Sequence, residues 1–274
     1  MYTESLANLF RCLAILSLAF GFSRVGVAQD QSDTDGLQQL TAELREALSQ
    51  DDSPQAVQVL DQLIKLQPQQ PQLYYLRACE NYKAENFRRS VDDFDQLIKL
   101  QPDRKDSLWE RGISCYYAGD YADGAQQFLD YQNYHDQDVE NSVWRYLCLA
   151  KSESLAKARE TLIPIERDPR PGLQEVLELY RGNATPEKLL EQMEQSELTG
   201  QAQAGYRFYT LLYVGLYYVA EGQDKLASKY LAMAADRKLL EAGPSRISEY
   251  MWLTAGIAQR DVEKRLAKDA EKQK

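Results

Sequence analysis

The octapeptide DQLIKLQP stands at Asp61–Pro68 and again, 34 residues later, at Asp95–Pro102. Eight identical residues at a fixed spacing mark an internal repeat, and a period of 34 is typical of a unit made of two helices. Each copy ends at a proline, which stops a helix because its ring lacks an N–H donor and the residue before it avoids the helical region. The two copies therefore predict two equivalent helices that each end just before a proline.

Further residues at fixed positions extend the repeat in both directions. When each repeat is numbered so that its proline falls at position 32, position 8 holds the small residues Ala78 and Gly112, and position 24 holds Phe94 and Phe128. Small residues at positions 8 and 20 would let the two helices of a repeat approach closely, and large residues at position 24 would fill the space between repeats. No repeat buries its apolar face alone, so the repeats are expected to stack into a solenoid.

Other elements follow the first four repeats. Two prolines and a glycine, in the run Pro169–Gly172, mark a break. Two short helices are expected after the break, the second of them starting with Thr185 as N-cap and Pro186 in the first turn. A fifth repeat lies out of frame, with positions 8, 11, 15, 20, 24 and 27 occupied by Gly215, Tyr218, Gly222, Ala227, Leu231 and Ala234.

These positions resemble the tetratricopeptide repeat family. The resemblance implies an all-α fold, an α-solenoid of about five helix–turn–helix repeats with extra helices between the fourth and fifth. The predicted order is repeats one to four at 37–170, connecting helices at 171–200, a fifth repeat at 201–242, and a C-terminal capping helix with a charged tail at 243–274. The last helix is expected to present one apolar face, either to the stack as a cap or to a second protomer.

The N-terminus carries the features of an export signal. Residues 12–22 read CLAILSLAFGF, an apolar run too short to span a bilayer but suited to a signal-peptide core. The small residues Gly26 and Ala28 precede the expected cleavage point. We predict that 1–28 is a cleaved signal peptide, with an uncleaved anchor as the alternative. The mature chain would be periplasmic or secreted and soluble, without membrane insertion.

Charge and residue counts exclude several classes of function. The chain has 32 Lys+Arg against 42 Asp+Glu, a net charge of −10, which argues against nucleic acid as a partner and favours basic protein partners. Its one histidine, His135, is expected in a solvated loop, and it excludes multi-histidine metal sites. Asp92, Asp93 and Asp95 are expected to form a solvated helix face. There is no Gly-rich phosphate loop and no HExxH or GxSxG motif, so no catalytic residue, metal or cofactor is predicted.

Three cysteines follow the predicted signal. Cys79, Cys115 and Cys148 have no CxxC spacing, which makes a metal site improbable. We predict that they are small buried side chains. A disulfide between Cys115 and Cys148 is the alternative.

Within the repeat class, the chain resembles the NlpI-type bacterial lipoproteins. The resemblance is carried by Arg111–Gly119 (RGISCYYAG), by Trp144 with Tyr146-Leu147, by Glu178–Asn183 and by Leu212–Gly222 (LYVGLYYVAEG). It implies a homodimeric envelope protein without catalytic activity, an adaptor that brings peptidoglycan hydrolases to a periplasmic tail-specific protease. The chain departs from that family because it lacks the cysteine that would carry a lipid anchor.

By resemblance to the tetratricopeptide family, the first helix of each repeat lines a concave groove. In repeats two and three this groove would be aromatic, and tyrosine and tryptophan suit protein-binding surfaces because they offer apolar area with a polar tip. The alternative is that some of these rings only pack between helices. The predicted protein-binding residues are Tyr75, Tyr82, Lys83, Trp109, Ile113, Tyr116 and Tyr117.

Three functions remain open at this point. The leading prediction is an exported adaptor that binds other proteins or peptides through the aromatic groove. One rival is a structural homodimer of the envelope without a client. The other is an enzyme with a cryptic site in the groove or in residues 171–200.

Overall fold

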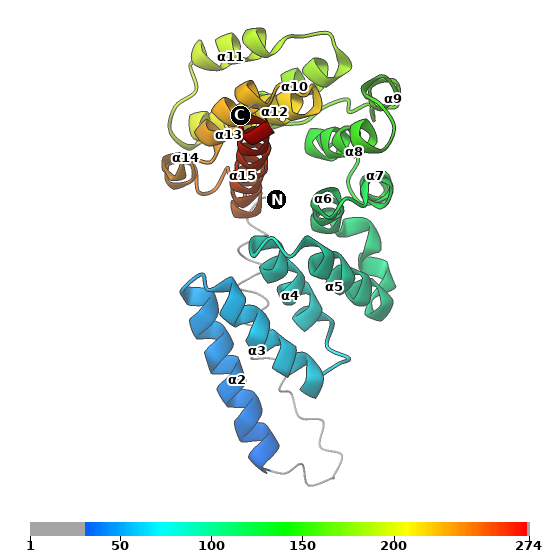
Figure 1. Cartoon of the computed structure of the whole chain (residues 1–274), viewed down its shortest axis with the longest axis vertical. Coiled ribbons are helices and arrows are strands. Elements are labelled where there is room, and N and C mark those ends of the chain that lie inside the picture. The colour runs from blue at the N-terminus through cyan, green and yellow to red at the C-terminus, as the bar shows by residue number, and fades with distance from the viewer. Residues whose placement is uncertain (1–30, 273–274) are drawn as a thin grey trace. The chain divides into compact units, whose positions relative to one another are not determined.

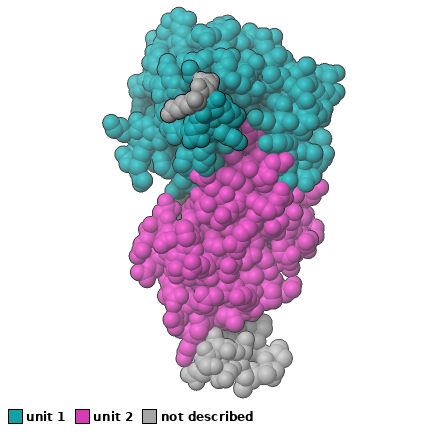
Figure 2. All heavy atoms as spheres, in the orientation of Figure 1, with its two compact units in different colours: residues 1–5, 120–274 teal, residues 6–119 magenta. Residues whose placement is uncertain are grey.

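The computed structural model describes residues 31–272, and every regular element among them is a helix (Figure 1). This confirms the predicted all-α class. The predicted signal peptide at 1–28 lies outside the described residues. The chain divides into two compact units, coloured separately in Figure 2: unit 2 reaches Gly119, and unit 1 continues from Asp120. Among residues 31–272, no helix combines the length and the apolarity that crossing a bilayer requires.

Unit 2 holds the first two repeats and the first helix of the third. Consecutive helices pack on one another, α2 on α3, α3 on α4, α4 on α5 and α5 on α6. Their bounds are α2 (Gln31–Ser49), α3 (Ser53–Leu66), α4 (Pro71–Lys83), α5 (Phe87–Leu100), the 3-10 helix η1 (Pro102–Ser107) and α6 (Trp109–Ala118).

The two octapeptides form the ends of α3 and α5. Helix α3 ends at Leu66, two residues before Pro68, and α5 ends at Leu100, two residues before Pro102. The predicted helix stops are therefore confirmed. At its other end α3 is capped by Asp52, whose carboxylate accepts a 3.0 Å hydrogen bond from the backbone N–H of Gln55.

Close packing between repeats uses the small residues at positions 8 and 20. Ala78 at position 8 is fully buried, and its carbonyl accepts a 2.8 Å hydrogen bond from the hydroxyl of Ser90 at position 20. The same hydroxyl lies 3.0 Å from that of Ser114 on α6. Ser90 therefore joins both helices of its own repeat and the first helix of the next.

A row of arginines at position 7 adds ionic links between helices. The guanidinium of Arg77 contacts Asp61 at 2.6 Å on α3 and Asp93 at 2.5 Å on α5, and Arg111 contacts Asp95 at 2.7 Å. Asp93 is buried, so the prediction of a fully solvated acidic face is wrong at this residue. Burial raises the pKa of Asp93, although the neighbouring Arg77 opposes that effect.

Unit 1 contains the second helix of the third repeat and all later elements. Its bounds are α7 (Tyr121–Asp130), the 3-10 helix η2 (Tyr131–Asn133), α8 (Val139–Ser152), α9 (Leu155–Glu160), α10 (Leu173–Arg181), α11 (Pro186–Glu194), α12 (Gly200–Ala220), α13 (Asp224–Ala234), α14 (Arg237–Ala242) and α15 (Glu249–Lys272). The predicted cap of α11 is present, because the Thr185 hydroxyl accepts from the backbone N–H of Lys188. The fourth repeat departs from the pattern, since α9 has only six residues.

Helix α12 is the centre of unit 1. It packs against α8, α10, α11, α13, α14 and α15, which explains why thirteen of its residues are buried. Gly215 at position 8 faces Leu231 of α13 so closely that a Cβ atom on Gly215 would lie 2.7 Å from the Leu231 Cγ. Helix α15 lies on α12 and α13 and buries one apolar face, including Tyr250, Met251 and Ile257 (Figure 1).

Candidate functional site

The seven predicted groove residues lie on two helices of unit 2. Tyr75, Tyr82 and Lys83 are on α4, and the other four are on α6. Tyr82 and Ile113 are fully buried and Tyr116 nearly so. The side chains that reach the surface, each half-buried, are those of Tyr75, Lys83, Trp109 and Tyr117.

Two of the predicted tyrosines contact Phe87, a residue that was not among the predicted groove residues. Phe87, the first residue of α5, stacks on Tyr117 with ring centroids 5.1 Å apart and meets the ring of Tyr82 edge-on at 5.6 Å. Tyr116 packs edge-on against Tyr117 at 5.1 Å. The available signal was the position of Phe87 just across the turn from the end of α4. Tyr82 and Tyr116 thus pack in the core and position the half-exposed rings of Phe87 and Tyr117.

Tyr75 is held in place by a buried carboxylate. Its hydroxyl donates a 2.9 Å hydrogen bond to Glu110, which is buried on α6. Burial raises the pKa of Glu110 above its usual range, while the Tyr75 hydroxyl and Arg104 oppose that effect. The Arg104 guanidinium lies 5.8 Å from the Tyr75 ring centroid, a cation–π contact. With its hydroxyl engaged inside the chain, Tyr75 offers mainly its ring.

Lys83 is paired within the chain as well. Its ammonium lies 3.1 Å from Glu80 and 3.4 Å from Asp51. Burial lowers the pKa of Lys83, but the two carboxylates outweigh burial, so the net shift is upward. Glu80 also accepts a 2.7 Å hydrogen bond from the Ser53 hydroxyl. The surface formed by α4 and α6 therefore offers aromatic rings rather than unpaired charge.

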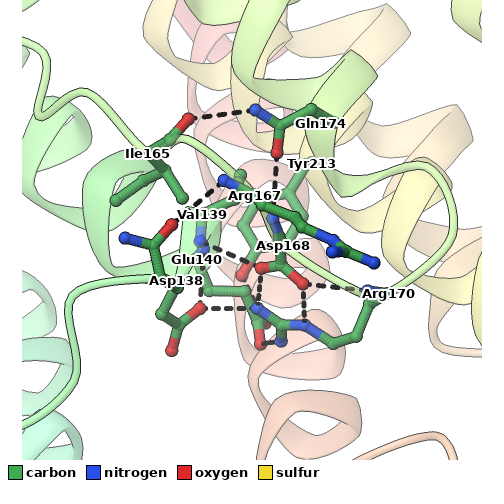
Figure 3. Close-up of polar contacts among 10 residues, drawn as sticks. Asp138, Val139, Glu140, Ile165, Arg167, Asp168, Arg170, Gln174 and Tyr213 are labelled. Atoms are coloured by element: carbon green, nitrogen blue, oxygen red, sulfur yellow. Dashed lines mark hydrogen bonds and ion pairs between the residues drawn. The ribbon is translucent and has the colours of Figure 1, made fainter.

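Unit 1 holds a cluster of charged side chains that was not predicted from the sequence (Figure 3). The guanidinium of Arg170 points at the carboxylates of Asp138, Glu140 and Asp168, at 2.6 Å from Asp138 and in direct contact with the other two. Asp168 accepts a 3.1 Å hydrogen bond from the backbone N–H of Val139. Figure 3 shows that these groups come from the start of α8 and from the non-helical stretch before α10.

Tyrosines of α12 complete this cluster. The Tyr213 hydroxyl donates a 2.6 Å hydrogen bond to Glu140, and the Arg170 guanidinium lies 5.7 Å from the ring centroid of Tyr209. Burial is the main cause that raises the pKa of Glu140 and that of Tyr213. The guanidinium of Arg170 forms ion pairs with all three carboxylates. No group of His, Cys, Asp and Glu in residues 31–272 has an arrangement suited to a metal ion. The cluster pins residues 163–172 to α8 and α12, which is a structural role.

The remaining candidates for chemistry are the one histidine and the three cysteines that follow the predicted signal. His135 is exposed in the loop before α8, as predicted. Cys79, Cys115 and Cys148 are buried and none of them forms a disulfide, which confirms their prediction as small buried side chains.

A comparison with known families supports the repeat assignment. Residues 75–138 match the tetratricopeptide repeat family, a stretch that contains all seven predicted groove residues. No curated protein matches the chain, so no relative supports the likeness to NlpI-type lipoproteins. Residues 75–138, from α4 to the loop before α8, are thus similar to tetratricopeptide repeats, and the described residues form an all-α fold in which most neighbouring helices pack on one another within each unit.

Proposed function

We propose that this protein is a non-catalytic scaffold that binds a segment of another protein on the aromatic surface of α4 and α6. Repeats of this family generally mediate protein–protein interactions. The observation that carries the proposal is the grouping of half-buried aromatic side chains, Tyr75, Trp109 and Tyr117, on the first helices of two successive repeats. Large aromatic side chains that remain partly exposed are typical anchors of protein interfaces.

The proposal extends to the cellular location, the oligomeric state and the clients of the scaffold. Export rests on the signal-like sequence at 1–28, and the homodimer rests on the resemblance to NlpI-type lipoproteins. On the same basis we propose that the clients are envelope proteins, including peptidoglycan hydrolases and a periplasmic tail-specific protease. The acidic balance of the chain suits basic partners, because opposite net charge speeds association.

The test begins with peptides selected from a random library displayed on phage, with the purified protein as bait. The dissociation constant of one selected peptide is then measured by calorimetry. Trp109→Ala is expected to weaken binding by about 30-fold, because truncating a central tryptophan in an interface typically costs about 2 kcal/mol. The matched control is Trp252→Ala on α15, which removes another half-buried tryptophan in unit 1 and should change the affinity less than about twofold.

Two results would contradict the proposal. One is the failure to select any peptide that binds saturably, and the other is an equal loss of affinity in the two tryptophan variants. Hydrolysis of peptides or peptidoglycan by the purified protein alone would favour the enzyme alternative. Far-ultraviolet circular dichroism of both variants checks that the helices are retained.

A further inference from the structure

Helix α13 leaves one of its sides open. It packs against α12 and against α15, and it buries Ala227, Leu231 and Ala234 in those contacts. These three residues follow one another at helical spacing, so they lie on one side of the helix. The helix surface next to this buried side carries Lys225, Leu226, Lys229, Tyr230 and Met233, which we name the open face of α13.

The open face carries an apolar stripe. Leu226 is 37% exposed and Met233 is 38% exposed, and Tyr230 is half-buried between them. Their spacing of four and then three residues places the three side chains along a single line. Only five large apolar side chains in the described part of the chain are exposed, and two of them belong to this stripe. Stripes of this spacing are the usual anchors in helix-to-helix docking.

A row of positive charge flanks the stripe. Lys225 and Lys229 are exposed one helical turn apart, and neither has a carboxylate within ion-pair distance in residues 31–272. The nearest acid in sequence, Asp224, is bound by Arg265 at 2.9 Å. The Lys229 ammonium lies 4.9 Å from the Tyr230 ring centroid, which holds it beside the stripe. The open face is therefore locally basic in a chain whose net charge is −10.

The ring of Tyr230 is held in place by contacts inside unit 1. The Tyr230 ring stacks on that of Tyr218 at 5.8 Å, and the Tyr218 hydroxyl donates a 3.2 Å hydrogen bond to Glu187 at the start of α11. These contacts hold the Tyr230 ring in its place within the stripe. The open face is preorganised, so a partner would lose little binding free energy in ordering it.

We propose that the open face of α13 docks an amphipathic helix of another protein, one with an apolar stripe and a flanking row of aspartate or glutamate. The apolar side chains of that helix would cover Leu226, Tyr230 and Met233, and its carboxylates would pair with Lys225 and Lys229. A second copy of this chain is the less suitable occupant, because two-fold pairing of the open face brings its lysines toward one another. This surface lies on unit 1 and selects a different chemistry from the aromatic surface of α4 and α6.

The probe is a fluorescein-labelled 18-residue helical peptide with leucines at the spacing of the stripe and glutamates beside them. Binding to the full chain is followed by fluorescence anisotropy. Saturable binding is expected, and L226S/M233S should weaken it at least tenfold. L129S/Y134S, which removes exposed apolar side chains elsewhere in unit 1, is the matched control and should change the affinity less than twofold. Thermal melts of both variants check that the fold is retained.

A charge reversal tests the lysines separately. K225E/K229E should weaken the glutamate peptide at least tenfold, whereas the control K151E/K188E, which reverses two other exposed lysines of unit 1, should not. A second peptide with lysines in place of the glutamates should bind K225E/K229E more tightly than it binds the unaltered protein. Trp109→Ala should leave the affinity for the first peptide unchanged, which separates this surface from that of α4 and α6.

Four outcomes would overturn the proposal. They are the absence of saturable binding, an equal loss in the control variants, loss of peptide affinity in Trp109→Ala, and a change of oligomeric state in L226S/M233S with unchanged peptide affinity. The last result, measured by sedimentation, would make the open face a contact between copies of the chain.

Discussion

Replacing Arg170 by methionine is expected to lower the free energy of unfolding by about 3–5 kcal/mol, the range measured when one partner of a buried ion pair is removed. Arg170 is the cation that contacts the carboxylates of Asp138, Glu140 and Asp168. Without it, the three carboxylates would remain close together with little access to water. Urea denaturation followed by circular dichroism measures the loss. The matched control is Arg237→Met, which breaks an exposed pair with Glu241 and should change stability by less than about 0.5 kcal/mol.

The loss should depend on pH in a definite direction. Burial holds the pKa of Glu140 above its usual value, and Arg170 opposes that shift, so the variant should raise this pKa further. A raised carboxyl pKa means that the folded state binds the proton more readily than the unfolded state. The penalty of Arg170→Met should therefore shrink as the pH falls through the raised pKa of Glu140, where this carboxylate gains a proton.

A double variant tests the role of Glu140 further. Adding Glu140→Gln to Arg170→Met should recover part of the lost stability at neutral pH, because it removes one of the crowded negative charges. A stability difference that stays constant with pH, or that grows as the pH falls, would contradict the role given to Glu140.

The second large effect is expected at Gly215, where α12 and α13 touch. Valine here should lower the free energy of unfolding by about 3 kcal/mol, the upper part of the usual range for overpacking. The reason is that a Cβ atom would lie 2.7 and 2.8 Å from two side-chain carbons of Leu231 and 3.2 Å from its backbone nitrogen. The backbone atom cannot move aside as a flexible side chain can, so the two helices would have to separate. Urea denaturation measures the loss.

Controls for this prediction use glycines and the facing residue. Gly256→Ala on α15 should be neutral or stabilising, because the nearest atom to its added Cβ is the flexible end of Arg260 and alanine favours a helix. Leu231→Ala combined with Gly215→Ala should be less destabilising than the sum of the two single changes. Additive effects would mean that the close approach of α12 and α13 is not what requires glycine.

The fold was predictable wherever the repeat pattern acts locally. Proline placed the ends of α3 and α5, and Thr185 placed the start of α11, because each acts on the backbone beside it. The short α9 and the extended chain after it were not predicted. That stretch is held by Arg170, whose three acidic partners lie at distances in sequence that no periodic pattern encodes.

The candidate site was predictable at the level of helices but not of side chains. The repeat positions predicted that the seven residues lie on the first helices of repeats two and three, which are α4 and α6. They could not separate the buried Tyr82 and Ile113 from the half-exposed Trp109, because burial depends on what the neighbouring helix places opposite each residue. Phe87 covers Tyr82 from across a turn, and its position beside that turn indicates that it lies near α4 but not which ring it contacts. The binding role of the seven residues stays a prediction.

The duplicated octapeptide allows the chain to lose or gain a whole repeat of 34 residues. Deleting 69–102 would join Pro68 to Asp103 and leave a single intact copy of DQLIKLQP. Arg111 would then face Asp61 at the position where it now faces Asp95, so the junction between neighbouring helices would keep the same chemistry. Inserting a second copy of that 34-residue cassette would likewise create no junction that the protein does not already contain. Recombination between the two copies would thus lengthen or shorten the protein by one repeat of 34 residues while keeping the sequence of each junction.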